Sequence, residues 1–253
     1  MNKNKKKTLS LRNIIGIGLS VLFIITLISA SKWANYRNSF YLSKINISGY
    51  KILDREDYEN ILSDFKVQSI NNYKLREISN KIEKNPFVKA VQVSRQFPNV
   101  INVNIVERKP LAIINLDEQL MIDSDAYILP NHHFIDSALI PVLSGFNPEK
   151  DLYPYGKETF SVKVKEAISI LNQLSTSFNT LYNNISEITL NNNDDYVIIL
   201  SDRPTRVILG KNDIITKLNI LKSFDESLGQ RQLTDFRLLD MRYNKQLVAK
   251  EWS

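Results

Sequence analysis

The sequence has 253 residues, a formal net charge of +6 and no cysteine. A chain of this length predicts two compact domains of about 100 residues each, and without cysteine they must be stabilised by core packing rather than by disulfides. Five basic residues lie within the first 12 positions, before any acidic residue, so the rest of the chain is close to neutral. A nucleic-acid partner is therefore not expected, because it would require a basic face on the folded part.

The first 32 residues predict a basic cytoplasmic tail, residues 1–12, and a transmembrane helix over residues 13–32. No charged residue occurs from Asn13 to Ser31. At about 1.5 Å per residue this run spans about 28 Å, close to the hydrocarbon thickness of about 30 Å. Trp33 and Tyr36 follow, where amphipathic rings favour the headgroup region. Positive charge before the helix predicts that the N-terminus lies inside the cell; the orienting residues are Lys5, Lys6, Lys7 and Arg12.

A cleaved signal peptide is the competing interpretation of this region, because Ser29-Ala30-Ser31 offers small residues after a basic start. The apolar cores of signal peptides are about 7 to 15 residues long, which is shorter than this run, so a retained anchor in the lipid bilayer is favoured. The bulk of the chain is then expected outside the cytoplasmic membrane. A single span also argues against a channel or a transporter.

Residues 43–110 predict a small α+β domain in the order strand, helix, helix, strand, strand. Apolar and polar residues alternate in the strands, and apolar residues recur at three and four positions in the helices. Two helices covering one face of a mixed sheet give a workable hydrophobic core. The segments are 44–49, 54–65, 75–85, 88–95 and 100–107, with a turn at Phe97-Pro98-Asn99 and a solvated linker at Glu107-Arg108-Lys109-Pro110.

Residues 111–253 predict a second, strand-dominated domain with two helices packed against it. The helices have apolar residues along one face, over 164–178 and 214–228, and Gly229 is well placed to end the second one. Short apolar runs bounded by polar turns predict the strands. These runs are 111–115, 120–122, 127–129, 185–190, 196–201, 205–209, 236–239 and 246–249.

No motif in the chain carries reaction chemistry. There is no Gly-x-Ser-x-Gly turn, no cysteine nucleophile and no glycine cluster that could hold a phosphate. His132 and His133 with Asp136 have the residue types of a metal site, but Pro130-Asn131 precede them and favour a surface loop. We therefore expect no catalytic, cofactor-binding or metal-binding residue, no cofactor and no small-molecule substrate.

The segment from Asn85 to Ala112 resembles the signature of the FtsQ/DivIB family of bacterial cell-division proteins. It contains an Arg followed by an aromatic-Pro turn, and a strand ending in Glu, a basic pair and Pro. Weaker similarities occur at Leu120–Asp123, at Ile140–Gly145 and over the closing hairpin, 239–250. One departure is visible, since a glycine usually sits two residues after the Asp placed at Asp123. The resemblance implies a POTRA domain at 43–110 and a β domain at 111–253.

The resemblance also implies a function: a non-enzymatic scaffold at the division septum that links early ring proteins to late septal wall-synthesis proteins. The implied partners are FtsB/DivIC-like and FtsL-like single-pass proteins, bound mainly through the final strands of the β domain. Such binding is physically reasonable, because a terminal strand leaves backbone N–H and C=O groups to which a partner strand can add. The implied partner-binding residues are Arg242, Tyr243, Gln246, Leu247, Val248 and Trp252.

Simpler interpretations of these residues remain open. Arg242 and Tyr243 could form an ordinary turn, and Trp252 could lie in a frayed terminus. An alternative function is a POTRA-containing envelope-assembly or protein-translocation component, although the long series of strands of a membrane pore is missing. An anchored cell-wall hydrolase would require catalytic side chains that the sequence does not show.

Overall fold

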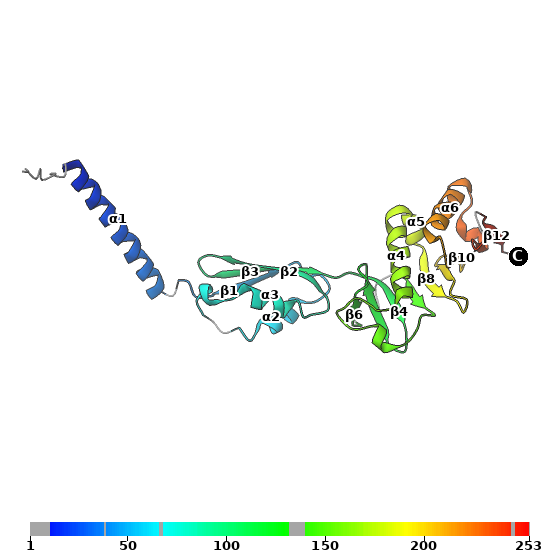
Figure 1. Cartoon of the computed structure of the whole chain (residues 1–253), viewed down its shortest axis with the longest axis horizontal. Coiled ribbons are helices and arrows are strands. Elements are labelled where there is room, and N and C mark those ends of the chain that lie inside the picture. Colours follow the sequence, from blue (N-terminus) through cyan, green and yellow to red (C-terminus); the bar gives the residue numbers. More distant parts are fainter. Residues whose placement is uncertain (1–10, 38, 66–67, 132–139, 244–245, 253) are drawn as a thin grey trace, which may run out of the picture. The chain divides into compact units, whose positions relative to one another are not determined.

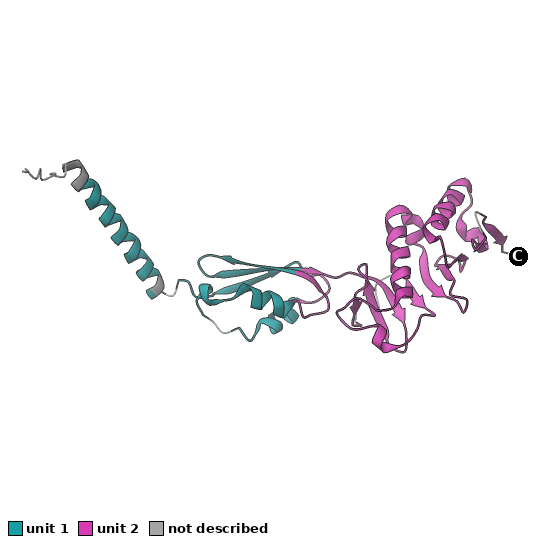
Figure 2. Ribbon diagram, viewed as in Figure 1, with its two compact units in different colours: residues 1–49, 55–82, 91–105 teal, residues 50–54, 83–90, 106–253 magenta. Residues whose placement is uncertain are grey.

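The structure is a computed structural model that describes residues 11–37, 39–65, 68–131, 140–243 and 246–252. Over these ranges it contains an apolar N-terminal helix and two compact units (Figure 1, Figure 2). Unit 1 runs to residue 49 and includes 55–82 and 91–105; unit 2 comprises 50–54, 83–90 and the remainder from 106. The predicted α+β class, with an N-terminal helix followed by an α/β module and a strand-rich region, is confirmed.

Helix α1 (Leu11–Tyr36) contains a stretch, Ile15–Ala34, that is long and apolar enough to cross a membrane. It extends beyond the predicted 13–32, because neither glycine nor proline interrupts the sequence from Ser31 to Tyr36. Of the residues predicted to orient it, Lys5, Lys6 and Lys7 lie outside the described residues. Arg12 lies within α1, but its side chain is likewise outside the description.

The first module is a three-stranded sheet in the order β1-β3-β2, with helices between its first two strands in the sequence. In β3, Ile101, Val103 and Ile105 are buried at alternate positions, which defines the face that packs into the core. Tyr58 of α2 and Ile78 and Ile82 of α3 are fully buried in this core. The elements are β1 (Lys44–Ser48), α2 (Arg55–Leu62), η1 (Ile70–Asn72), α3 (Leu75–Ile82), β2 (Val88–Gln96) and β3 (Val100–Glu107).

The second module is a nine-stranded mixed sheet in the order β12-β11-β10-β9-β8-β7-β4-β5-β6. Its strands are β4 (Pro110–Asn115), β5 (Gln119–Asp123), β6 (Ile128–Leu129), β7 (Val142–Ser144), β8 (Ile185–Leu190), β9 (Tyr196–Leu200), β10 (Arg206–Gly210), β11 (Phe236–Asp240) and β12 (Val248–Glu251). Its helices are η3 (Lys150–Leu152), α4 (Val162–Ser177), α5 (Asn179–Tyr182), α6 (Ile214–Ser227) and η4 (Leu233–Asp235).

The helices α4 and α6 connect parallel strands of this sheet. Helix α4 lies between β7 and β8 in the sequence, α6 lies between β10 and β11, and both strand pairs are parallel. Parallel neighbours need such a crossover, because a tight turn can join only antiparallel strands. Buried side chains of both helices and of the sheet form one continuous hydrophobic cluster, which includes Leu171, Ile198 and Leu221.

The segment predicted to be a solvated linker is solvated only in part. Lys109 is exposed, but Glu107 is buried and the side chain of Arg108 nearly so, and for these two residues the prediction was wrong. The carboxylate of Glu107 accepts hydrogen bonds from the backbone N–H groups of residues 51, 52 and 53. The Arg108 side chain is 10% exposed and pairs with Asp123, which is 3% exposed, at 2.7 Å. The sequence shows charge at these positions but not the partners that allow it to be buried.

Gly145 is a position at which the fold excludes a side chain. Its φ is +74°, and a Cβ there would lie 2.3 Å from the carbonyl oxygen of Leu190. We expect Gly145→Ala to reduce the free energy of unfolding by more than about 2 kcal/mol, because it combines left-handed backbone strain with a backbone clash. Denaturant unfolding of residues 40–253, followed by the fluorescence of their single tryptophan, Trp252, measures this effect.

Gly229 provides the matched control for this prediction. Its φ is +63°, but a Cβ there would meet no atom within 4 Å. We therefore expect Gly229→Ala to reduce the free energy of unfolding by only about 1 kcal/mol, from the left-handed backbone strain alone. Equal decreases in the free energy of unfolding of the two variants would show that the clash with the Leu190 carbonyl oxygen does not destabilise Gly145→Ala.

Candidate functional site

One edge of the nine-stranded sheet is covered by the chain itself. At β6, the Ile128 N–H donates to the Lys157 carbonyl at 2.9 Å, and the Gly156 N–H donates to the Ile128 carbonyl at 2.8 Å. The Thr159 N–H donates to the carbonyl of Ala126 at 2.8 Å. These bonds occupy backbone groups that an added strand would need, so β6 offers no free edge.

The opposite edge, β12, is open within the part of the chain that the structure describes. β12 pairs antiparallel with β11, with Val248 opposite Asp240 and Lys250 opposite Leu238. No described strand lies on its other side. All four residues of β12 are exposed. An exposed strand with one unpaired side is the arrangement that accepts a further strand.

The distal end of β12 is fastened to the domain. The indole N–H of Trp252 donates to the Thr234 carbonyl at 3.1 Å, and the Arg203 guanidinium lies 5.9 Å from the centre of the indole ring. Arg231 pairs with Glu251 at 2.8 Å. Trp252 is thus not frayed in this structure, and its side chain faces its own domain. These contacts keep the strand extended without any partner.

At the proximal end, Arg242 is held by carboxylates of the sheet. Its Nη2 lies 2.6 Å from Oδ2 of Asp240 and its Nε lies 3.0 Å from Oδ1; Nη1 lies 3.6 Å from Asp195. Hydrogen bonding to Arg242 lowers the pKa of Asp240, and the same bond raises the pKa of Arg242. The Arg242 side chain is still 41% exposed at the turn that follows β11, where Asp240 and Asp195 hold it in place.

The structure brings together four of the six predicted partner-binding residues at the proximal end of β12. Arg242, Tyr243, Gln246 and Val248 are all exposed there. Leu247 is partly buried and packs against the hydrophobic core. Trp252 lies at the other end of the strand. Sequence reasoning missed Asp240 and Asp195, although the spacing of two residues between Asp240 and Arg242 was a usable signal, because such residues share one side of an extended chain.

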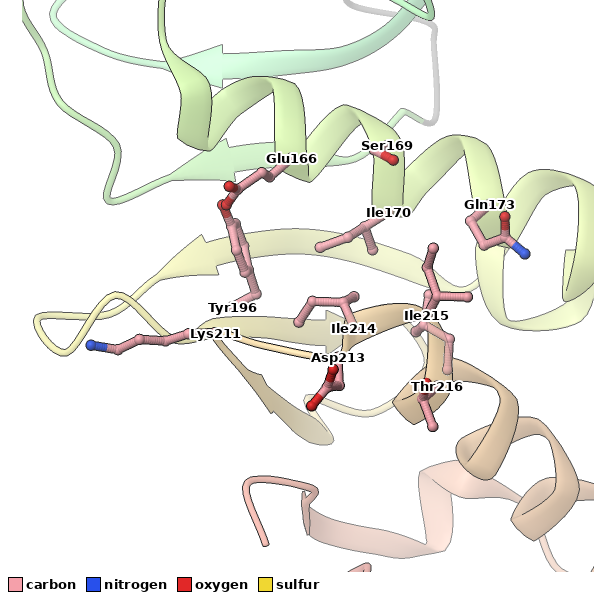
Figure 3. A pocket seen from close by; sticks show the side chains of 11 residues that line it. Glu166, Ser169, Ile170, Gln173, Tyr196, Lys211, Asp213, Ile214, Ile215 and Thr216 are labelled. Carbon is pink, nitrogen blue, oxygen red and sulfur yellow. The ribbon is translucent and has the colours of Figure 1, made fainter. Parts of the chain in front are cut away.

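A cavity of about 420 Å³ between α4 and α6 is the other candidate site (Figure 3). In Figure 3, Glu166 and Tyr196 point toward each other, and the Tyr196 hydroxyl donates to the carboxylate at 2.5 Å. Burial raises the pKa of Tyr196 above its usual value. This pair is explained by packing, since Tyr196 is fully buried and its hydroxyl needs an acceptor.

Among the described residues, no group of three histidine, cysteine or acidic side chains is placed to hold a metal ion. His132, His133 and Asp136, the metal-like set in the sequence, lie outside the described residues.

Comparison with known protein families gives matches to both modules. The family described as "POTRA domain, FtsQ-type" matches residues 40–108. The family described as "Cell division protein FtsQ/DivIB, C-terminal" matches residues 112–242, about half of the chain. The chain belongs to the FtsQ/DivIB family of cell-division proteins. The predicted resemblance is confirmed, and this is a family of non-catalytic division proteins.

Several FtsQ proteins are similar to this FtsQ/DivIB member along much of its length. The cell division protein FtsQ of Geotalea daltonii is 26% identical over 214 residues, which cover 84% of this chain and 76% of that protein. FtsQ of Syntrophotalea carbinolica is 24% identical over 212 residues, covering 83% and 74%. FtsQ of Rickettsia typhi is 36% identical over a shorter stretch of 89 residues, covering 35% of this chain and 34% of that protein.

The paired Asp240 predicts a specific acid dependence of stability. Because its pKa is lower in the folded state than its usual value of 3.8, its contribution is fully present above pH 3.8 and is lost as the pH falls through the lowered pKa. We expect Asp240→Asn to destabilise residues 40–253 most near neutral pH, with a difference from wild type that shrinks below pH 3.8. Denaturant unfolding across this pH range measures it.

Asp151→Asn serves as the control, because Asp151 is exposed. We expect the free energy of unfolding of Asp151→Asn to equal that of the wild type at every pH. A stability difference for Asp240→Asn that stays constant down to the lowest pH would contradict the proposed stabilisation of the Asp240 carboxylate by Arg242.

Proposed function

We propose that the chain is a non-enzymatic, membrane-anchored scaffold of the division machinery that acts by binding other proteins at β12. One observation carries this proposal: the sheet has two edges, and the chain covers β6 but leaves β12 open among the described residues. Natural proteins usually protect exposed strand edges, because an unprotected edge associates with other chains. An extended, fastened and uncovered edge therefore supports a role in binding.

The proposed partners are FtsB/DivIC-like and FtsL-like single-pass proteins, at least one of which adds a strand to β12. Main-chain hydrogen bonds would contribute about 0.5–1.5 kcal/mol each, and side chains at the proximal end would provide selectivity. Tyr243 and Val248 are 54% and 40% exposed, and both can bury apolar surface against a partner. Arg242 is paired with Asp240 and lies 3.6 Å from Asp195, so its charge is compensated within the domain, and what it offers a partner is its 41% exposed guanidinium as a hydrogen-bond donor.

The location follows from the same proposal. The chain is a division protein with one N-terminal candidate membrane span. The basic tail supports an N-in orientation that leaves both modules outside the cytoplasm. Concentration at the septum, and a link between early ring proteins and late wall-synthesis proteins, would then result from simultaneous binding at the two sides of the membrane.

The first test combines Tyr243→Ala with Val248→Asp in the full chain. The double variant should bind the small single-pass partners roughly 100-fold more weakly, because it removes an aromatic anchor and places a charge on the docking edge. Co-purification measures binding, and rescue of filamentation after depletion of the wild-type protein measures function. Wild type should rescue, and the double variant should not.

Val162→Asp is the matched control, since Val162 is a 66% exposed valine at the start of α4, in the connection between β7 and β8, neither of which neighbours β12 in the sheet. It should bind and rescue like the wild type. Normal division after depletion would reject the division role and favour the envelope-assembly alternative. Full partner capture by the double variant would reject β12 as the docking edge.

Orientation is tested separately with alkaline phosphatase fused after residue 253, since this enzyme is active only outside the cytoplasm. We expect high activity with the native tail. Replacing Lys5, Lys6, Lys7 and Arg12 with glutamate should lower it several-fold, because the positive charge that retains the tail is removed. Unchanged activity would show that the tail does not determine orientation.

A further inference from the structure

The turn between β2 and β3 carries an exposed aromatic ring that the binding edge at β12 does not explain. The turn comprises Phe97, Pro98 and Asn99, and Phe97 is 61% exposed. The ring adds little to the core of the first module. This aromatic-Pro turn also belongs to the segment from Asn85 to Ala112, which carries the signature of the family.

The turn lies at the end of the sheet where the chain enters from helix α1. Lys44, the first residue of β1, pairs with Val100, the first residue of β3. Immediately before them, the Ser43 N–H donates to the Asn99 carbonyl at 2.9 Å. Tyr41, two residues earlier, is 46% exposed. Tyr41, Lys44 and Phe97 thus belong to one end of the module, which we call the entry end.

The chain between α1 and the entry end is very short. The Ser39 N–H still donates to the Ala34 carbonyl at 3.0 Å, and the next residue, Phe40, already accepts a bond from the Ile70 N–H at 2.7 Å. Four Cα steps separate Tyr36 from Phe40, which allow at most about 14 Å. Trp33 and Tyr36 at the end of α1 are of the type that marks the headgroup region. The entry end is therefore tethered at the membrane surface.

The charge of the entry end is compatible with this position. The segments that meet there, 39–49, 68–73 and 91–105, contain Lys44 and Arg95 and no acidic residue. Arg95 donates hydrogen bonds to the carbonyls of Ile70 and Tyr73, which joins the hairpin to η1. Basic groups near a membrane surface are attracted by anionic lipids. The carboxylates that flank residues 68–73 along the chain, Asp64 and Glu77, are each paired with a lysine, Lys81 and Lys74, so they oppose this attraction little.

We infer that the entry end is a lipid-docking surface, with the rings of Phe97 and Tyr41 among the headgroups and Lys44 facing anionic lipid. Aromatic rings favour this region because they combine apolar faces with tolerance of the polar boundary. Docking would hold the first module on the bilayer in one orientation, where a bare tether would let it rotate. The inference needs only the membrane span and does not depend on the proposed scaffold function.

Site-specific labelling of the full chain tests the inference, because the absence of native cysteine makes single-cysteine variants straightforward. An environment-sensitive dye is placed at Gln96→Cys, beside the turn, or at Asn104→Cys, near the other end of β3. The proteins are reconstituted in nanodiscs of phosphatidylcholine and phosphatidylglycerol that contain a headgroup-depth quencher lipid. We expect quenching at residue 96 to exceed that at residue 104 at least two-fold.

The tether alone brings residue 96 near the bilayer, so the decisive comparison removes the rings. Adding Phe97→Ser and Tyr41→Ser should lower the quenching at residue 96 at least two-fold, whereas Val106→Ser, which removes a 50% exposed apolar side chain elsewhere on β3, should leave it unchanged. All three side chains are exposed, so the fold should be retained. Quenching that is equal at the two sites, or that is unaffected by the loss of both rings, would overturn the inference.

Discussion

The ion pair between Arg108 and Asp123 fixes the start of the second module. The Arg108 guanidinium lies 3.6 Å from the centre of the Tyr127 ring, and the other oxygen of Asp123 accepts the N–H groups of Asp125 and Tyr127. Lys89 adds a contact with Asp125 at 2.6 Å. Breaking a buried pair by removing one partner costs about 3–5 kcal/mol, because the remaining charge stays buried. Asp123 also lies opposite Pro110, the first residue of β4, so this ion pair sits where the pairing of β4 with β5 begins.

The two edges of the nine-stranded sheet differ in whether the chain covers them. The segment after β6 returns to cover the first edge with backbone hydrogen bonds. At β12, the side chains of Trp252 and Glu251 contact the rest of the domain and hold the strand in place. No described segment covers the backbone on its outer side. This difference between the two edges is what supports our proposal that β12 accepts a strand from another chain. Both contacts, those of Trp252 and Glu251, lie at the distal end of β12, away from the exposed residues around Tyr243.

Much of this fold could be predicted from local patterns, while long-range partners could not. Alternation located β2 and β3, and apolar spacing located α4 and α6, because both signals are local. Nothing local shows that the three-residue strand β7 lies between β4 and β8. The turn after Asp123 is similar: the left-handed residue is Ala126, with φ of 61°, at a position where the sequence offers no glycine. The exposed residues near β12 were found only through family resemblance, and the carboxylates that hold Arg242 were missed.

The strand order also has a consequence for synthesis. β12 follows every other strand along the chain and pairs only with β11, which in turn needs β10 beside it. A chain that emerges from its N-terminus onward therefore completes the edge at β12 after the central strands and both crossover helices are available. A chain in which β10 or β11 is not yet in place has no completed edge at β12. Our proposal that partners add to β12 therefore implies that binding begins only after this module has folded, so the position of the edge along the chain acts as a check on folding.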